Sequence, residues 1–214
     1  MTAITSESTK VRNQICRVGE SLFTRGLTPG STGNISVRLD DGTMLMTPTN
    51  ASLGDLDPAT LSHVDADGKH LAGDKPTKEA LLHTCMYCER PSAGAVVHLH
   101  CTHAVAVSIL ADVDTANVLP PLTAYYLMRV NTLPLIPYFA PGDRDLALSV
   151  KEKAGNHHAV LLANHGPVVA GSSLSDAQDA IEELEETAKL FLMLHGHELR
   201  LLTDKQAADL RAKS

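Results

Sequence analysis

The chain has 214 residues, a formal net charge of −7 at pH 7 and a composition of 43% hydrophobic and 20% charged residues. This size and composition are typical of one globular domain with a sizeable core, so we expect a single domain over residues 1–214. Lysine and arginine are scattered along the chain, which argues against a basic face that binds nucleic acid. An acidic protein that binds an anionic substrate needs a local positive site, such as a metal ion or a group of backbone N–H groups.

The first ten residues, MTAITSESTK, lack the apolar core of a signal peptide, and no apolar run approaches the length that spans a membrane. Four cysteines in a chain of this size do not indicate a disulfide scaffold. We therefore predict a cytoplasmic protein with reduced thiols and no membrane partner.

The N-terminal third predicts a helix followed by a hairpin. Apolar residues recur with a helical period over residues 7–25, and Gly26 is expected to end that helix. A loop rich in glycine and hydroxyl side chains, residues 27–34, precedes strands at 35–38 and 44–46, which the turn at 40–42 joins. The polar loop 47–50 follows. Two such loops at one end of a hairpin suit a phosphate, although ordinary turns share their composition.

The remainder alternates helices with short strands. We expect helices at 75–89, 104–110, 143–153, 175–195 and 204–213, and strands at 95–99, 133–138, 159–163 and 168–171. Asp143 and Ser175 are the predicted N-caps of their helices, and the acidic run at 182–186 is predicted to face solvent. The pattern indicates an α/β fold with a mainly antiparallel sheet between helix layers.

Three histidines and a glutamate are the candidate metal ligands. His98 and His100 alternate along one strand and so project from the same side of it. His165 ends a buried strand, and Glu79 lies in the first turn of a predicted helix. Three imidazoles with an open position suit Zn²⁺ as a Lewis acid, with Mn²⁺ or Co²⁺ as alternatives. Taken one at a time, these residues have structural explanations: histidines at strand ends, and a carboxylate that complements a helix dipole.

Five short motifs together resemble the class II aldolase/adducin family. GSTGN (30–34), TPTN (47–50), PTKE (76–79), VVHLH (96–100) and ANHG (163–166) occur in the order and roughly the spacing of that family. The resemblance covers the chain from about Val11 to His195. It implies a three-layer αβα domain with a mainly antiparallel central sheet, a C4 homotetramer with active sites between subunits, and a divalent metal held by His98, His100 and His165.

The resemblance also implies roles for the remaining site residues. The position of Glu79 matches the acid/base carboxylate of the family, which can also touch the metal. The phosphate pocket of the sugar-phosphate aldolases maps onto Gly33, Asn34, Thr49, Asn50, Thr77 and Lys78. Lys78 stands where fuculose-phosphate aldolase has a serine, and Asn50 where it has a glycine. The added positive charge is compatible with phosphate, but these differences argue against fuculose phosphate as the substrate.

Within the family, PTKE, HLHCTH (98–103) and LPPLTAYY (119–126) most resemble the 3-oxo-tetronate 4-phosphate decarboxylases. Glutamate at position 79 argues against an epimerase, because the ribulose-phosphate 4-epimerases carry aspartate there. The resemblance implies decarboxylation to dihydroxyacetone phosphate and CO₂ through a metal-stabilised enediolate. A sugar-phosphate aldolase of the fuculose or rhamnulose type is the alternative, and a non-catalytic adducin-like module the third possibility.

Two kinds of residue are candidates for moving the proton that the enediolate requires. Glu79 is predicted to supply or relay it. Tyr125 or Tyr126, from a neighbouring subunit, is a second candidate donor, although a core or interface role is the default for both tyrosines. The other histidines are expected to be surface or structural residues: His63, His70, His83, His103, His157, His158, His195 and His197.

Overall fold

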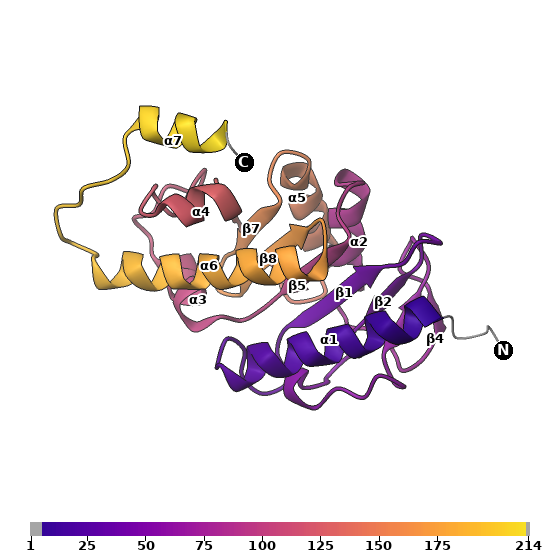
Figure 1. The fold of residues 1–214 in the computed structure, drawn as a ribbon. Coiled ribbons are helices and arrows are strands. Elements are labelled where there is room, and N and C mark those ends of the chain that lie inside the picture. The colour runs from indigo at the N-terminus through magenta and orange to yellow at the C-terminus, as the bar shows by residue number, and fades with distance from the viewer. Residues whose placement is uncertain (1–5, 213–214) are drawn as a thin grey trace.

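The computed structural model describes residues 6–212, which form one eight-stranded sheet with helices on both faces (Figure 1). The strand order is β4-β3-β2-β1-β5-β8-β7-β6. Neighbouring strands are antiparallel except β6 and β7, which are parallel. The strands are β1 (Asn34–Arg38), β2 (Met44–Met46), β3 (Ser62–Val64), β4 (His70–Ala72), β5 (Ala95–His98), β6 (Leu135–Ile136), β7 (Ala159–Leu162) and β8 (Gly166–Gly171). The predicted α/β class and mainly antiparallel sheet are confirmed.

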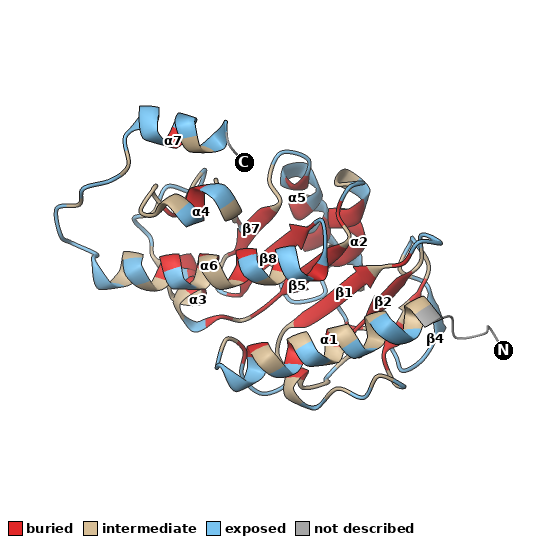
Figure 2. Cartoon of the chain, viewed as in Figure 1, coloured by how far each residue is buried: buried red, intermediate tan, exposed pale blue. Residues whose placement is uncertain are grey.

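The helices divide into two layers because the buried side chains of the strands alternate between the faces of the sheet. Val97 of β5 packs in one hydrophobic cluster with residues of α1, α3, α4 and α6, whereas Val96 packs in a second cluster with α2 and α5. Figure 2 shows the buried strands between these layers. The helices are α1 (Ser6–Thr24), α2 (Ala80–Glu89), α3 (Thr102–Ile109), α4 (Ala124–Arg129), α5 (Arg144–Ala154), α6 (Leu174–Met193) and α7 (Asp204–Arg211), with a 3₁₀ turn at Leu53–Asp55.

Helix α2 begins later than predicted because the residues before it pair with the loop after β2. Thr49 N–H donates to the Lys75 carbonyl at 2.9 Å, and Thr77 N–H donates to the Thr47 carbonyl at 3.3 Å. These contacts keep residues 75–77 out of the helix, a turn follows at 78–79, and Glu79 becomes the N-cap of α2. The TPTN and PTKE motifs consequently lie side by side.

Two predictions about α6 are wrong. Its N-cap is Ser173, whose hydroxyl accepts from Asp176 N–H, and Ser175 lies within the first turn. The acidic run does not simply face solvent: Glu182 pairs with Arg25, and Glu185 accepts from two backbone N–H groups at the start of α3. Asp143 caps α5 as predicted. Helix α7 is described to Arg211, and the final residue predicted for it, Lys213, lies outside the described residues.

Within residues 6–212, no helix combines the length and apolar character needed to cross a membrane. The four cysteines, at positions 16, 85, 88 and 101, are all free thiols.

Candidate metal-binding active site

The four candidate ligands come together at one end of the two central strands. His98 ends β5, and His165 directly precedes β8, its antiparallel neighbour. His100 follows β5 by two residues, and Glu79 reaches the same point from the start of α2. The ligand atoms of these four side chains all lie within 4.8 Å of one another.

The unpaired atoms of this group fit a divalent cation. Glu79 Oε2 lies 3.4 Å from His98 Nε2, and Glu79 Oε1 lies 3.4 Å from His165 Nε2. Among the described residues, Glu79 Oε1, His98 Nε2 and both ring nitrogens of His165 are buried without a hydrogen-bond partner, whereas most buried polar atoms in proteins have one. An ion between Glu79 Oε1, His98 Nε2 and one ring nitrogen of His165 would satisfy these three atoms together.

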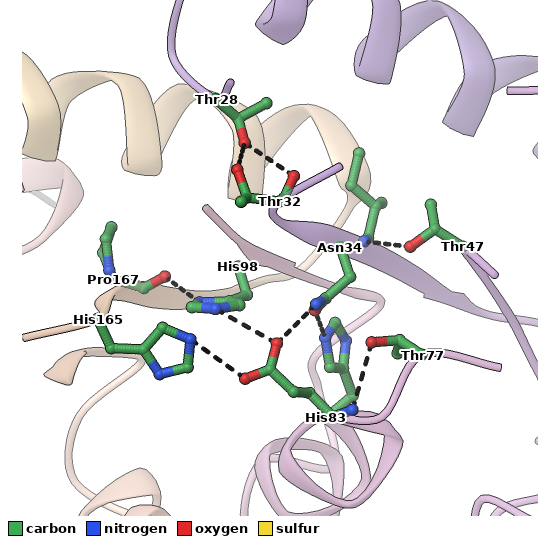
Figure 3. Close-up of polar contacts among 11 residues, drawn as sticks. Thr28, Thr32, Asn34, Thr47, Thr77, His83, His98, His165 and Pro167 are labelled. Carbon is green, nitrogen blue, oxygen red and sulfur yellow. Dashed lines mark hydrogen bonds and ion pairs between the residues drawn. The ribbon is translucent and has the colours of Figure 1, made fainter. Parts of the chain in front are cut away.

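The tautomer of His98 is fixed for metal binding. Its Nδ1 lies 2.8 Å from the carbonyl oxygen of Pro167 (Figure 3), and a carbonyl can only accept, so Nδ1 carries the proton. Nε2 therefore presents a lone pair toward Glu79 and His165. A backbone carbonyl that orients a ligating imidazole in this way is a common feature of metal sites.

The electrostatics of the site leave these groups in their ligating states. Burial lowers the pKa of His165 and of His100 to about 4, so both imidazoles are neutral at neutral pH. Burial alone would raise the pKa of Glu79, but it is outweighed by the positive charge that a facing histidine would carry on protonation and by the hydrogen bond that Asn34 donates, and the pKa lies below its usual value. Glu79 is therefore a carboxylate at neutral pH. Neutral imidazoles and ionised carboxylates are the forms that bind metals.

A cleft of about 140 Å³ joins this group to the predicted phosphate loops. It is lined by the candidate phosphate residues Gly33, Asn34, Thr49, Asn50, Thr77 and Lys78, and by Glu79, His100 and His165. Gly33 has φ +79°, and a Cβ there would lie 3.0 Å from the His98 carbonyl oxygen. The glycine lets the first loop pass close to the strand that carries a metal ligand.

The amide of Asn34 has partners at both ends. Its Nδ2 donates to Glu79 Oε2 at 2.8 Å, and its Oδ1 faces His83 Nε2. Figure 3 shows the Asn34 amide directed at His83. Although Asn34 lines the cleft, its side chain is thus already engaged in holding Glu79.

The two candidate tyrosines do not reach the cleft within this chain. Tyr126 is fully buried in the cluster on the α6 face, whereas His98 lies on the same side of β5 as Val96, which packs in the cluster on the α2 face. Tyr125 is 63% exposed and therefore available to a neighbouring molecule.

The structure also brings in residues to which the sequence analysis assigned no role at the site. His83, expected to be a surface or structural residue, is fully buried and lies one hydrogen bond away from Asn34. Ser36 and Tyr87 extend the contact beyond it. The sequence signal that could identify His83 and Tyr87 as neighbours of Glu79 is their spacing, because positions 79, 83 and 87 share one face of a helix.

The comparison with known families agrees with this geometry. Residues 13–192 match the family described as "Class II Aldolase and Adducin N-terminal domain". The chain belongs to the class II aldolase/adducin family. The predicted resemblance is confirmed, and the eight-stranded sheet between helices is the fold that class II aldolases share.

Individual relatives within the class II aldolase/adducin family are similar over nearly the whole chain. The 3-oxo-tetronate 4-phosphate decarboxylase of Escherichia coli strain K12 is 48% identical over 202 residues, which are 94% of this chain and 95% of the relative. The L-fuculose phosphate aldolase of the same strain is 36% identical over 188 residues, 87% and 84% of the two chains. The crystal structure of YgbL from Escherichia coli superposes with a TM-score of 0.93 at 47% identity, covering 95% of this chain and 99% of YgbL.

Proposed function

We propose that this protein catalyses the metal-dependent decarboxylation of 3-oxo-tetronate 4-phosphate to dihydroxyacetone phosphate and CO₂. The observation that carries the proposal is a cleft lined both by three members of the metal-ligand set, Glu79, His100 and His165, and by the candidate phosphate loops. A phosphorylated β-keto acid carries a keto acid group that suits the metal-ligand set and a phosphate that suits the loops. The 48% identity to the decarboxylase of Escherichia coli supports this substrate class.

The residues at the two ends of the cleft have different proposed roles. Glu79, His98, His100 and His165 would hold a divalent ion, Zn²⁺ by the donor set, with Mn²⁺ or Co²⁺ as alternatives. When bound, this ion supplies Lewis-acid stabilisation of the negative charge that develops on the substrate's oxygens. The phosphate would be bound by Gly33, Thr49, Asn50, Thr77 and Lys78. Asn34 borders the same pocket, but its side-chain amide is engaged with Glu79 and His83 and holds the carboxylate instead.

The reaction breaks the bond between the carboxylate carbon and the carbon beside the ketone. The electron pair passes into the enediolate, CO₂ departs, and one proton must then be added to the carbon that carried the carboxylate. Glu79 is ionised before the reaction, so it acts as a relay: it takes a proton from a hydroxyl group or water in the cleft and delivers it to that carbon. Tyr125 of a neighbouring subunit, on account of its exposure, is favoured over Tyr126 as a second donor.

A sugar-phosphate aldolase of the fuculose or rhamnulose type is the second candidate function. The 36% identity to the L-fuculose phosphate aldolase supports it. Both reactions leave the same enediolate and differ in the departing group, which is CO₂ in one and an aldehyde in the other. A non-catalytic adducin-like module is the least favoured function, because it gives no reason for four candidate ligand atoms to converge.

We further propose a cytoplasmic homotetramer with active sites between subunits. Large apolar side chains on the surface of this chain support an assembly, among them Tyr125 at 63% and Tyr138 at 64% exposure. Tyr138 lines a second cleft that also touches His100 and His165, so a neighbouring subunit packed there would border the site. The free thiols support a reducing compartment.

Product analysis tests the proposed reaction. Zn²⁺-loaded protein is given 3-oxo-tetronate 4-phosphate, and CO₂ and dihydroxyacetone phosphate are measured together. We expect equimolar release of both, abolished by a chelator and restored by added metal. Release of an aldehyde with dihydroxyacetone phosphate from a ketose 1-phosphate, without CO₂ from the β-keto acid, would establish the aldolase instead.

Replacing Glu79 tests the proton relay. Glu79→Gln keeps the size of the side chain but removes its basic oxygen, so we expect turnover to fall by about 10²–10⁴-fold while metal stays largely bound. Glu89→Gln, at the other end of α2, is the matched control and should leave turnover unchanged. Full activity of the Glu79 variant would remove this residue from the mechanism.

A further inference from the structure

Helix α2 and strand β1 face each other through a buried polar ladder, which we define as Glu79, His83 and Tyr87 on the helix with Asn34 and Ser36 on the strand. Four residues of a helix rise about 6 Å, and two residues of a strand rise about 6.8 Å. Residues four apart on α2 therefore stay opposite residues two apart on β1. Each of the five residues is less than a tenth exposed. Few water molecules can therefore compete for their hydrogen bonds.

The direction of each hydrogen bond in the ladder follows from the carboxylate at its end. An ionised carboxylate only accepts, so Asn34 must turn its Nδ2 to Glu79, as it does at 2.8 Å. Asn34 Oδ1 then has to accept, which requires a proton on His83 Nε2. His83 Nδ1 is left as an acceptor.

At the far end of the ladder, Ser36 Oγ lies 2.7 Å from His83 Nδ1 and donates its proton to that nitrogen. The Tyr87 hydroxyl lies 2.9 Å from Ser36 Oγ and 3.0 Å from the Ser36 carbonyl, and it shares its one proton between these two acceptors. Burial lowers the pKa of His83 to about 3, which keeps its ring neutral and able to accept at Nδ1.

We propose that His83 is a positioning residue that acts on Glu79 through Asn34. Its Nε2–H holds the Asn34 amide in the one orientation that donates to Glu79. Without that donor, the amide is free to turn over and present Oδ1 to the carboxylate, which repels it. This inference rests on the proposed function in one respect, which is the role of Glu79 as the proton relay.

The ladder is not a path for protons to Glu79. A carboxamide neither gains nor loses a proton readily, so Asn34 separates the carboxylate from the ring of His83. Glu79 therefore exchanges protons through the cleft, and the interior fixes only its position. This separation distinguishes His83 from a general acid or base.

A pair of variants tests the role of the Nε2–H donor. His83→Gln places an amide N–H near the position of Nε2, whereas His83→Leu is similar in size and has no donor. We expect His83→Leu to lower kcat about tenfold or more with little change in KM, as the loss of one hydrogen bond to a charged group implies, and His83→Gln to recover most of it. Glu89→Gln, outside the ladder at the other end of α2, is the control and should keep kcat within about threefold. Equal losses in the leucine and glutamine variants would overturn the proposal.

A measurement without turnover separates this inference from the proposed reaction. Nitrogen-15 NMR of the unmodified, metal-free protein reports the tautomer of His83, and we expect the proton on Nε2 at neutral pH. We also expect the side-chain amide protons of Asn34 to exchange faster in His83→Leu than in His83→Gln. A proton on Nδ1 alone would overturn the inference even if the protein decarboxylates its substrate. The expected tautomer together with no CO₂ release would reject the reaction and keep the positioning role.

Discussion

Replacing Tyr126 by phenylalanine should make the protein more stable. The Tyr126 hydroxyl is fully buried and has no hydrogen-bond partner among the described residues. Burial also raises the pKa of this side chain well above its usual value, so the group stays an unsatisfied phenol. An unpaired buried hydroxyl costs about 1–3 kcal/mol, and Tyr126→Phe removes it while the ring still fills its place in the α6-side cluster. We expect a gain of about 1 kcal/mol in the free energy of unfolding and a rise of about 2–4 °C in Tm.

Urea and thermal unfolding of the metal-free variant measure this gain, and the decarboxylation assay is run beside them. Tyr126→Phe should keep full activity because the hydroxyl lies in the α6-side cluster, away from the candidate ligands. Tyr125→Phe is the matched control for stability: its side chain is mostly exposed, and its unfolding free energy should not change. A destabilised Tyr126→Phe would show that the hydroxyl has a partner, and a loss of its activity would return Tyr126 to the candidate proton donors.

Three further predictions concern the site. Gly30→Ala and Gly33→Ala each place a side chain at positive φ and should lose about 1 kcal/mol of stability, but only Gly33→Ala should also weaken metal binding in a titration, because its Cβ meets the His98 carbonyl oxygen. His98→Ala should abolish stoichiometric binding of Zn²⁺ measured by metal analysis after dialysis. In chelator, urea midpoints should fall as the pH is lowered from about 6.5 toward 4, because the unfolded chain binds protons at His83 and His165, whose folded pKa values are lowered; a flat profile would contradict this.

Most of the candidate ligand set could be predicted because each member follows from local sequence. His98 and His100 share a side by strand alternation, and His165 follows a continuous apolar strand. The motifs that carry the family resemblance contain the same residues. What the sequence could not provide is the pairing of β5 with β8, which brings His98 beside His165, since sequence patterns do not specify strand neighbours across 67 intervening residues.

The residues behind the ligands were less predictable for a physical reason. His83 lies in a mostly apolar helical segment, so apart from its spacing of four from Glu79 its pattern matches any structural histidine in a helix. Its contact with Asn34 depends on how α2 lies over β1, which is a tertiary property. The predicted start of α2 is wrong for a similar reason. The β-bridge between Pro48 and Pro76 holds residues in a non-helical conformation that could otherwise extend the helix.

The central position of the two histidine-bearing strands determines how bound metal would stabilise the molecule. β5 and β8 are the fifth and sixth of eight strands, so opening of the edge strands β4 or β6 leaves His98 and His165 together. Separating them requires an opening that reaches the interior of the sheet. A bound ion would therefore raise the free energy of opening for the amides that exchange by global unfolding. The increase is about 1.4 kcal/mol for each tenfold excess of free ion over its Kd, and hydrogen exchange of these amides slows accordingly. Amides that exchange through local opening at the sheet edges would be insensitive to the ion.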